Sequence, residues 1–174
     1  MTLTLLTGGA RSGKSALAVR RAARSGLPVV FVATGEARDD EMADRIARHR
    51  EERPEGWATV EAPHDLVDAV RVLPPDHVVI VDCLSLWVSN LMERGDDEAA
   101  TVAAADELGR WATAYPGTVL VVTNEVGLGI VPMHPVSRDY RDRLGRVNAT
   151  VAAHADLAQL VVAGRTLTLD PRED

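Results

Sequence analysis

The chain has 174 residues, of which 46% are hydrophobic and 3% aromatic, and its formal net charge is −7 at pH 7. We expect one domain, residues 1–174, with a core of aliphatic side chains. The acidic balance argues against nucleic acid as a partner, because binding to a phosphate backbone requires clustered Lys and Arg. The apolar runs are too short to span a bilayer and Cys83 is the single cysteine, so a cytoplasmic location is expected.

Apolar runs alternate with helical patterns along the chain. Buried strands are predicted at 3–6, 29–33, 78–81 and 118–122, with short apolar runs near the end at 160–163 and 167–169. Helices are predicted at 14–24 and 40–52, and the alanine-rich segment 95–109 is interpreted as a solvated surface helix. Strands separated by helices indicate βα units, and therefore a mostly parallel sheet flanked by helices.

The first predicted strand leads into a glycine loop that matches GxxxxGK[ST] at every fixed position: Gly8, Gly9, Ala10, Arg11, Ser12, Gly13, Lys14 and Ser15. Loops of this kind hold phosphates with backbone N–H groups, and the following helix adds its positive N-terminal end. Lys14 is predicted to neutralise the β- and γ-phosphates, and Ser15 to bind Mg²⁺. The expected fold class is therefore α/β, of the RecA-like P-loop NTPase type.

A carboxylate follows the third predicted strand. The aliphatic run 78–81 places Asp82 at the carboxyl end of that strand, where the acidic residue of P-loop NTPases helps to hold Mg²⁺. The alternative is an aspartate that only caps the next segment. The sequence from Thr123 to Val126 lacks the lysine and aspartate of an NKxD-type motif, which disfavours a switch GTPase. A small-molecule kinase or nucleotidyltransferase remains.

A histidine and several arginines lie on the helix predicted at 40–52, which Asp39 or Asp40 can cap. One stripe at helical spacing contains Met42, Ile46, His49 and Arg53. Positive charge surrounds the stripe, from Arg45, Arg48 and Arg50. His49 is therefore either a cap for the last carbonyls of the helix or a nucleophile, kept neutral by cations that also hold a polyphosphate.

Several segments in this order resemble the bifunctional adenosylcobinamide kinase / adenosylcobinamide-phosphate guanylyltransferase family of cobalamin biosynthesis. They are TGGARSGKS, VATGEARDDEMADRIARHREERPEGWATVEAP, VDCLSLWVSNL, TNEVGLGIVP and YRDRLGRVNATVAAHAD. The resemblance implies that ATP or GTP phosphorylates the aminopropanol hydroxyl of adenosylcobinamide. It also implies that GTP guanylylates a histidine, which falls on His49, and that the GMP then passes to the new phosphate to give adenosylcobinamide-GDP.

The resemblance also implies nucleotide contacts outside the glycine loop, at Ala33, Thr34, Gly35, Arg50, Glu51, Glu52, Arg53, Glu61 and Asp82. It implies a homo-oligomer, a trimer, with adenosylcobinamide and its phosphate as substrates and Mg²⁺ bound with the nucleotide. The chain departs from the family pattern at Met133–Pro135 and at Ala149. Asn124, Glu125 and Arg146 are candidates for substrate or interface contacts, and Trp87 and Leu91 for an interface or for the core.

Two alternatives remain at this stage. The first is a small-molecule kinase without guanylyl transfer, in which His49 is a helix cap. The second is a nucleotide-gated binding module without turnover, which the arginine-ringed histidine disfavours, since a switch requires no such group.

Overall fold

The computed structural model describes residues 2–51 and 53–170, except for the side chains of Glu41, Arg45, His49 and Glu51. The strands are β1 (Thr2–Thr7), β2 (Val29–Ala33), β3 (Ala58–Glu61), β4 (Val78–Asp82), β5 (Thr118–Val122), β6 (Leu157–Val162) and β7 (Arg165–Leu169). The helices are α1 (Lys14–Arg24), α2 (Asp40–Glu51), α3 (Leu66–Arg71), α4 (Leu84–Arg94), α5 (Glu98–Ala114) and α6 (Pro135–His154).

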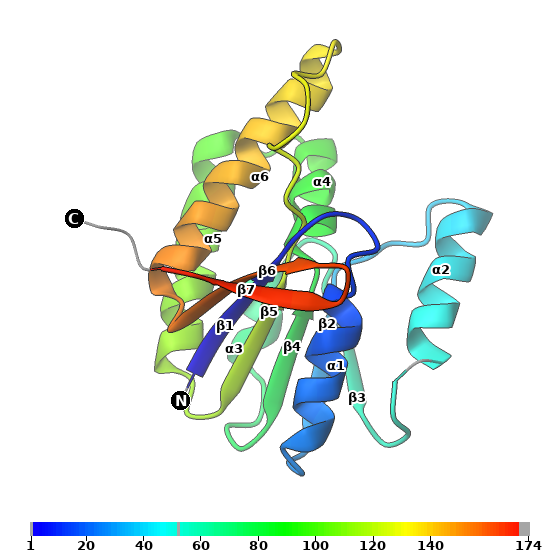
Figure 1. The fold of residues 1–174 in the computed structure, drawn as a ribbon, viewed down its shortest axis with the longest axis vertical. Helices are drawn as coiled ribbons and strands as arrows, with labels where there is room; N and C mark the ends of the chain where they lie inside the picture. The colour runs from blue at the N-terminus through cyan, green and yellow to red at the C-terminus, as the bar shows by residue number, and fades with distance from the viewer. Residues whose placement is uncertain (1, 52, 171–174) are drawn as a thin grey trace.

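All of these strands join one seven-stranded sheet in the order β3-β2-β4-β5-β1-β6-β7 (Figure 1). Strands β1 to β6 are parallel, and β7 runs antiparallel to β6 as the second strand of a hairpin. The carboxyl ends of the parallel strands therefore meet at one edge, where ligands of open α/β sheets bind. The expected α/β fold of P-loop type is confirmed.

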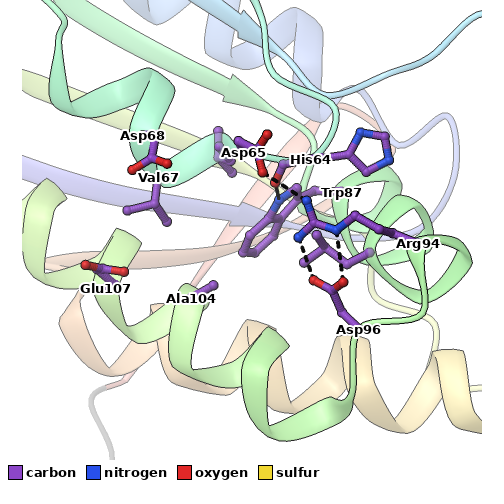
Figure 2. Close-up of a pocket in the computed structure, with 11 residues that line it drawn as sticks. His64, Asp65, Val67, Asp68, Trp87, Arg94, Asp96, Ala104 and Glu107 are labelled. Atoms are coloured by element: carbon purple, nitrogen blue, oxygen red, sulfur yellow. Dashed lines mark hydrogen bonds and ion pairs between the residues drawn. The ribbon is translucent and has the colours of Figure 1, made fainter.

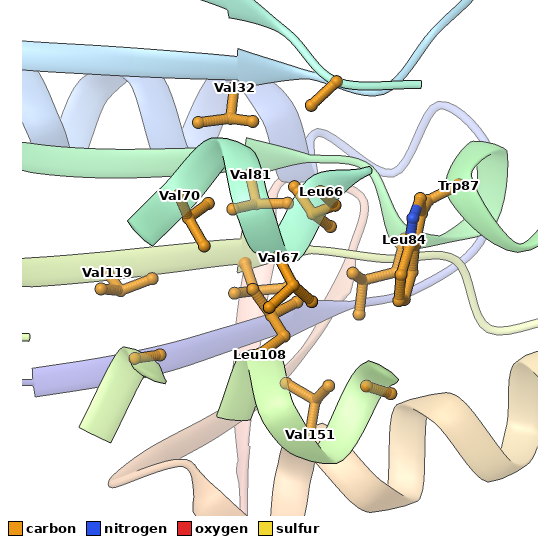
Figure 3. Close-up of a cluster of buried hydrophobic side chains, with 14 of the residues drawn as sticks. Val32, Leu66, Val67, Val70, Val81, Leu84, Trp87, Leu108, Val119 and Val151 are labelled. Carbon is orange, nitrogen blue, oxygen red and sulfur yellow. The ribbon is translucent and has the colours of Figure 1, made fainter. Parts of the chain in front are cut away.

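Helices cover the sheet unequally. Alternate residues of the central strands, such as Val81 and Val119, pack against α3 to α6 in the larger of two hydrophobic clusters (Figure 3). The other strand face packs mainly against α1 through Ala18 and Ala22, together with Phe31 of β2. The core is aliphatic as predicted, because a parallel sheet buried on both faces favours Val, Leu and Ile.

The helix predicted over 95–109 is observed as α5, but it begins at Glu98 and one of its faces is buried, so the interpretation of this segment as solvated was wrong for that face. Asp97 caps α5 by accepting a hydrogen bond from the Ala100 N–H at 2.7 Å. One face of α5 is fully or almost fully buried, at Thr101, Ala105, Leu108, Gly109 and Ala112. Small residues on that face let α6 approach closely, and composition alone does not reveal such a face.

The sequence WVSNL in α4 belongs to the core. Trp87 and Leu91 are 1% and 2% exposed, and the Trp87 indole donates a hydrogen bond to the His64 carbonyl at 2.8 Å. Of the two roles considered for these residues, core packing is therefore the one observed in this protomer. Among the described helices, none combines the length and apolar character needed to cross a bilayer.

Candidate nucleotide-binding site

The glycine loop follows β1 directly and ends where α1 begins, as its sequence predicts. Gly8 and Gly13 have φ angles of 148° and 98°, values that glycine adopts without strain. The Lys14 ammonium donates a hydrogen bond to the Gly9 carbonyl at 2.7 Å. The lysine thus folds back along the loop, beside the N-terminal end of α1 where a phosphate is favoured.

Neighbouring segments hold this loop from two sides. The Gly164 N–H, in the β6–β7 turn, donates to the Ser12 carbonyl at 2.8 Å, and the Glu125 N–H donates to the Gly8 carbonyl at 3.1 Å. A Cβ on Gly8 would lie only 2.3 Å from the Val161 carbonyl oxygen. The β6–β7 turn was not predicted from the sequence, although three residues that include Gly164 separate the apolar runs 160–163 and 167–169, and such a short connection is a signal for a hairpin.

Asp82 is the last residue of β4, which lies two strands from β1 in the sheet order, about 10 Å away. Asp82 and Ser15 are both half-buried. Their oxygens are the hard donors that Mg²⁺ prefers when nucleotide phosphates complete its coordination. Within residues 2–51 and 53–170, no group of three His, Cys, Asp or Glu side chains could hold a metal on its own. The pair therefore fits a metal delivered with a nucleotide.

The strand-end loop after β2 is tied to the loop after β4. Thr34 is fully buried, and its hydroxyl donates to the Cys83 carbonyl at 2.7 Å and accepts from the Cys83 N–H at 2.8 Å. The Thr34 N–H donates to the Asp82 carbonyl at 3.2 Å. Since these groups bond within the protein, Thr34 shapes the loop between the half-buried Ala33 and Gly35.

The residues beyond α2 lie over the β2–β3 end of the sheet. The Arg53 guanidinium carbon is 3.5 Å from the centroid of the Phe31 ring, and one Arg53 nitrogen donates to the Thr59 hydroxyl at 3.2 Å. Burial lowers the pKa of Arg53, and the charge of Asp82 opposes this shift. Arg50 forms an ion pair with Glu61. Arg50, Arg53 and Glu61, predicted as nucleotide contacts, are therefore neighbours.

Helix α2 itself begins as predicted. The Asp39 carboxylate accepts a hydrogen bond from the Met42 N–H at 2.7 Å, so Asp39 is the cap. Figure 1 shows α2 beside the β2–β3 end of the sheet, with β3 four strands from β1, about 19 Å. The predicted roles of the His49 and Glu51 side chains, and of Glu52, lie outside the described residues.

A polar network occupies the strand ends on the α6 side. Asn124 donates to the Ser85 hydroxyl at 3.1 Å, and its carbonyl accepts from the Asn148 amide at 2.9 Å. The Glu125 carboxylate accepts from the Gly127 N–H at 2.5 Å. Arg146, by contrast, forms an exposed ion pair with Glu98. Asn124 and Glu125 thus lie beside the glycine loop, whereas Arg146 pairs with α5.

A shallow pocket of about 150 Å³ lies elsewhere, between α3, α4 and α5 (Figure 2). Arg94 bridges Asp65 and Asp96 at its mouth, at 2.9 and 2.6 Å. Trp87 forms part of its wall. None of the predicted nucleotide-binding residues lines this pocket, and its carboxylates are already paired: Asp65 and Asp96 with Arg94, and Asp68 and Glu107 with Arg71.

A glycine loop between a parallel strand and a helix, with a carboxylate at the end of a nearby strand, defines a P-loop nucleotide-binding protein. Solved structures agree on the fold. Flagellar accessory protein FlaH from Methanocaldococcus jannaschii covers 98% of this chain and 78% of its own, with 13% identity and a TM-score of 0.54. An ATPase of the type III secretion system of pathogenic bacteria covers 91% of this chain and 50% of its own, with 10% identity and a TM-score of 0.57.

Sequence comparison identifies the family. Residues 4–169 match the cobinamide kinase / cobinamide phosphate guanyltransferase family. The bifunctional adenosylcobalamin biosynthesis protein CobP of Pseudomonas aeruginosa is 41% identical over 166 residues, covering 95% of each chain. CobU of Escherichia coli, with the same description, is 41% identical over 175 residues, covering 93% of this chain and 96% of its own. The chain therefore belongs to this family of bifunctional cobalamin biosynthesis enzymes, which confirms the resemblance inferred from its segments.

Proposed function

We propose that this chain catalyses two successive reactions on one corrinoid substrate. It phosphorylates adenosylcobinamide with a nucleoside triphosphate, and then transfers GMP from GTP, through a guanylylated His49, to adenosylcobinamide phosphate. Family membership supports the pair of reactions. The observation that carries the nucleotide chemistry is the glycine loop, whose Lys14 folds back onto the Gly9 carbonyl and whose backbone is held by Glu125, after β5, and by Gly164 in the β6–β7 turn.

In the first reaction the aminopropanol oxygen of the corrinoid attacks the γ-phosphorus. The new O–P bond forms as the bond to the β–γ bridging oxygen breaks, the hydroxyl proton is released, and the nucleoside diphosphate leaves. Lys14 and the loop N–H groups, from Gly8 to Ser15, neutralise charge on the phosphates. Ser15 and Asp82 would hold Mg²⁺, which would supply further charge neutralisation. ATP and GTP are both candidate phosphoryl donors.

In the second reaction an imidazole nitrogen of His49 attacks the α-phosphorus of GTP. An N–P bond forms, the bond to the α–β bridging oxygen breaks, and pyrophosphate leaves with the electron pair. A phosphate oxygen of the corrinoid then attacks the same phosphorus, and the N–P bond breaks to restore the imidazole. The product is adenosylcobinamide-GDP.

Cations near α2 support this role. The buried Nε of Arg53 has no hydrogen-bond partner among the described residues, which suits contact with a phosphate. We assign Arg50, Glu51, Glu52 and Arg53, together with the segment Ala33–Gly35, to nucleotide contacts. Glu61, exposed at the end of β3, is assigned to donors of the guanine or ribose.

The test is covalent labelling. Protein incubated with α-labelled GTP should acquire acid-labile, base-stable label, and His49→Asn should abolish the label while phosphorylation of adenosylcobinamide continues. His64→Asn, which alters a histidine of the α3–α5 pocket, is the matched control and should label normally. Label that persists in His49→Asn, or wild-type protein that never labels, rejects the guanylyl transfer mechanism and leaves a kinase.

We also propose that copies of this chain assemble into a homo-oligomer, a trimer. The segment after β5 supports assembly, because its apolar side chains Leu128, Ile130 and Met133 are 85%, 97% and 90% exposed in the protomer. Light scattering on the purified protein gives the mass directly. A monomeric mass at micromolar concentration would contradict the assembly.

The cytoplasmic location expected from the sequence stays a prediction.

A further inference from the structure

Asn90 is a buried residue whose side-chain amide joins the segments that follow β2 and β3, at the carboxyl edge of the sheet (called the nucleotide edge below). It lies on α4 and is 3% exposed. Its amide nitrogen donates to the carbonyls of Thr34, after β2, and Pro63, after β3, both at 2.8 Å. Its side-chain oxygen accepts a hydrogen bond from the Arg38 guanidinium, also at 2.8 Å. The donors and the acceptor of this side chain are thus all engaged.

Arg38 precedes α2 and connects that helix to α4. Besides Asn90, its guanidinium pairs with Glu93, one turn further along α4, and with Glu36 at 3.1 Å. The hydrogen bond to Glu93 is the main cause that raises the pKa of Arg38. A planar guanidinium that contacts an amide oxygen and a carboxylate together fixes direction as well as distance. The side-chain contacts of Arg38 with α4 therefore orient the start of α2.

The middle of α2 lies against the same loop that Asn90 holds. A Cβ on Gly35 would lie 3.6 Å from Cδ1 of Ile46 and 3.4 Å from Cδ1 of Leu86, so side chains of α2 and α4 both pack close to this loop. Asn90 therefore fixes the position of the Thr34–Gly35 loop through its hydrogen bond to Thr34, and Arg38 fixes the start of the helix that packs against this loop. Any shift of Arg38 changes where the α2 side chains stand relative to the nucleotide edge.

We infer that Arg38 and Asn90 are positioning residues for guanylyl transfer: they hold α2, which carries His49, in register with the strand-end loops that receive the nucleotide. The inference rests on the proposed role of His49. It assigns no contact with substrate to either residue. The proposed phosphoryl transfer takes place at the glycine loop and uses no catalytic group on α2, so a change at Arg38 should affect it much less than guanylyl transfer.

The experiment compares two half-reactions in the full-length protein. Arg38→Ala is expected to slow single-turnover labelling by α-labelled GTP at least about tenfold, since a small misplacement of reacting groups costs that much or more. Its rate of adenosylcobinamide phosphorylation should stay within about twofold of wild type. Arg38→Lys keeps the charge but cannot contact Asn90 and Glu93 in the same plane, and should recover only part of the labelling rate.

Arg94→Ala is the matched control. Arg94 is also an arginine with ion pairs at α4, but its partners Asp65 and Asp96 belong to the α3–α5 pocket. It should label like wild type. Glu93→Ala provides a second variant, which removes the carboxylate partner of Arg38 and leaves Asn90 intact, and it should slow labelling by a smaller factor.

Equal labelling by Arg38→Ala and wild type would overturn the inference. An equal loss of both half-reactions would overturn it as well, because a merely structural role predicts that pattern. Wild-type protein that fails to label at His49 refutes the proposed function, and this inference with it. These results are distinguishable, since only the last one appears in the unmutated protein.

Discussion

The glycine loop lies at the carboxyl ends of the strands and helix α2 lies beside the β2–β3 end of the sheet, and the two are held in different ways. Backbone groups fix the loop, through hydrogen bonds from Gly164 and Glu125. Side chains hold α2, chiefly Arg38 at its start and the Arg50 and Arg53 contacts at its end. Backbone contacts survive most substitutions, whereas side-chain contacts can each be removed by one. Phosphate binding and guanylyl transfer should therefore respond differently to mutation.

The largest expected effect tests the loop half of this comparison. Lys14→Ala removes the ammonium that neutralises the β- and γ-phosphates, and should lower kcat for phosphoryl transfer by about 10³-fold. Rates are measured with adenosylcobinamide and ATP or GTP. If GTP labelling of His49 falls by a similar factor, then the same loop holds the nucleotide in both reactions.

Arg24→Ala, at the exposed end of the same helix, is the control for charge removal and should keep the wild-type rate. A Lys14→Ala enzyme within tenfold of wild type would mean that the glycine loop is not the phosphate site of the kinase reaction.

Adjacent glycines provide the second test. Gly8→Ala introduces a Cβ that would lie 2.3 Å from the Val161 carbonyl oxygen, at a φ of 148° that L-residues rarely adopt. It should lower the free energy of unfolding by about 3 kcal/mol. A Cβ on Gly9 meets no atom within 4 Å, so Gly9→Ala should cost less than about 1 kcal/mol. Urea unfolding measures both, and equal stabilities would show that the β6 backbone does not confine the loop.

Cys83, in the loop after β4, should make the stability of the protein depend on pH. Burial, with Asp82 beside it, raises the pKa of Cys83 to about 11. An unfolded thiol ionises near pH 8.5, so above that pH the unfolded chain releases a proton that the folded chain retains. The stability that this thiol contributes is complete below about pH 8.5 and is lost as pH rises toward 11, with about 2 kcal/mol lost by about pH 10.

Urea unfolding of wild type and Cys83→Ser at pH 7 and pH 10 isolates that contribution, because the other titrating groups are common to both proteins. Wild type should lose more stability than the variant at the higher pH. Parallel losses would mean that the thiol is as accessible in the folded protein as in the unfolded chain.

Sequence patterns predicted the elements of both regions, including α2, whose predicted range 40–52 compares with the observed Asp40–Glu51. The ranges 14–24 for α1, 29–33 for β2 and 118–122 for β5 agree with the observed elements. These segments are local: a strand, a glycine turn and a helix follow one another, and each has its own periodicity. The whole P-loop unit could therefore be predicted from consecutive residues.

The elements that were missed have weak local signals. Strand β3 is short and mostly exposed, so its apolar pattern is incomplete. Helix α4 buries the polar residues Ser85 and Asn90 together with its apolar ones, which obscures the amphipathic period. Helix α5 was predicted, over 95–109, but its buried face was missed because small residues form it: a Cβ on Gly109 would lie 2.3 Å from the His154 ring.

Strand order and long-range pairs were beyond prediction for a further reason. Nothing in the α2 sequence states that β3 lies four strands from β1, or that Arg38 meets Asn90, 52 residues away. Both follow from the crossovers of the sheet. Parallel sheets bring together residues that are distant in sequence, and single-sequence patterns do not encode which ones.

The smallest expected effect concerns the far end of α2. Arg53→Ala removes a guanidinium that stacks on Phe31 and bonds Thr59, and should lower the free energy of unfolding by about 1–2 kcal/mol. Arg48→Ala, whose Nε donates within its own helix to the Asp44 carbonyl at 3.3 Å, should change it by less than about 0.5 kcal/mol.

Labelling by GTP separates the two possible uses of Arg53. If it only anchors α2, then Arg53→Lys, which keeps the stem but lacks the planar group, should lose stability and labelling rate together. If its partnerless Nε binds a phosphate, the labelling rate should fall much further than the folded fraction, with a raised KM for GTP. Unchanged labelling in a destabilised Arg53→Ala protein would remove Arg53 from the nucleotide site and leave Arg50 as the cation nearest to Glu61.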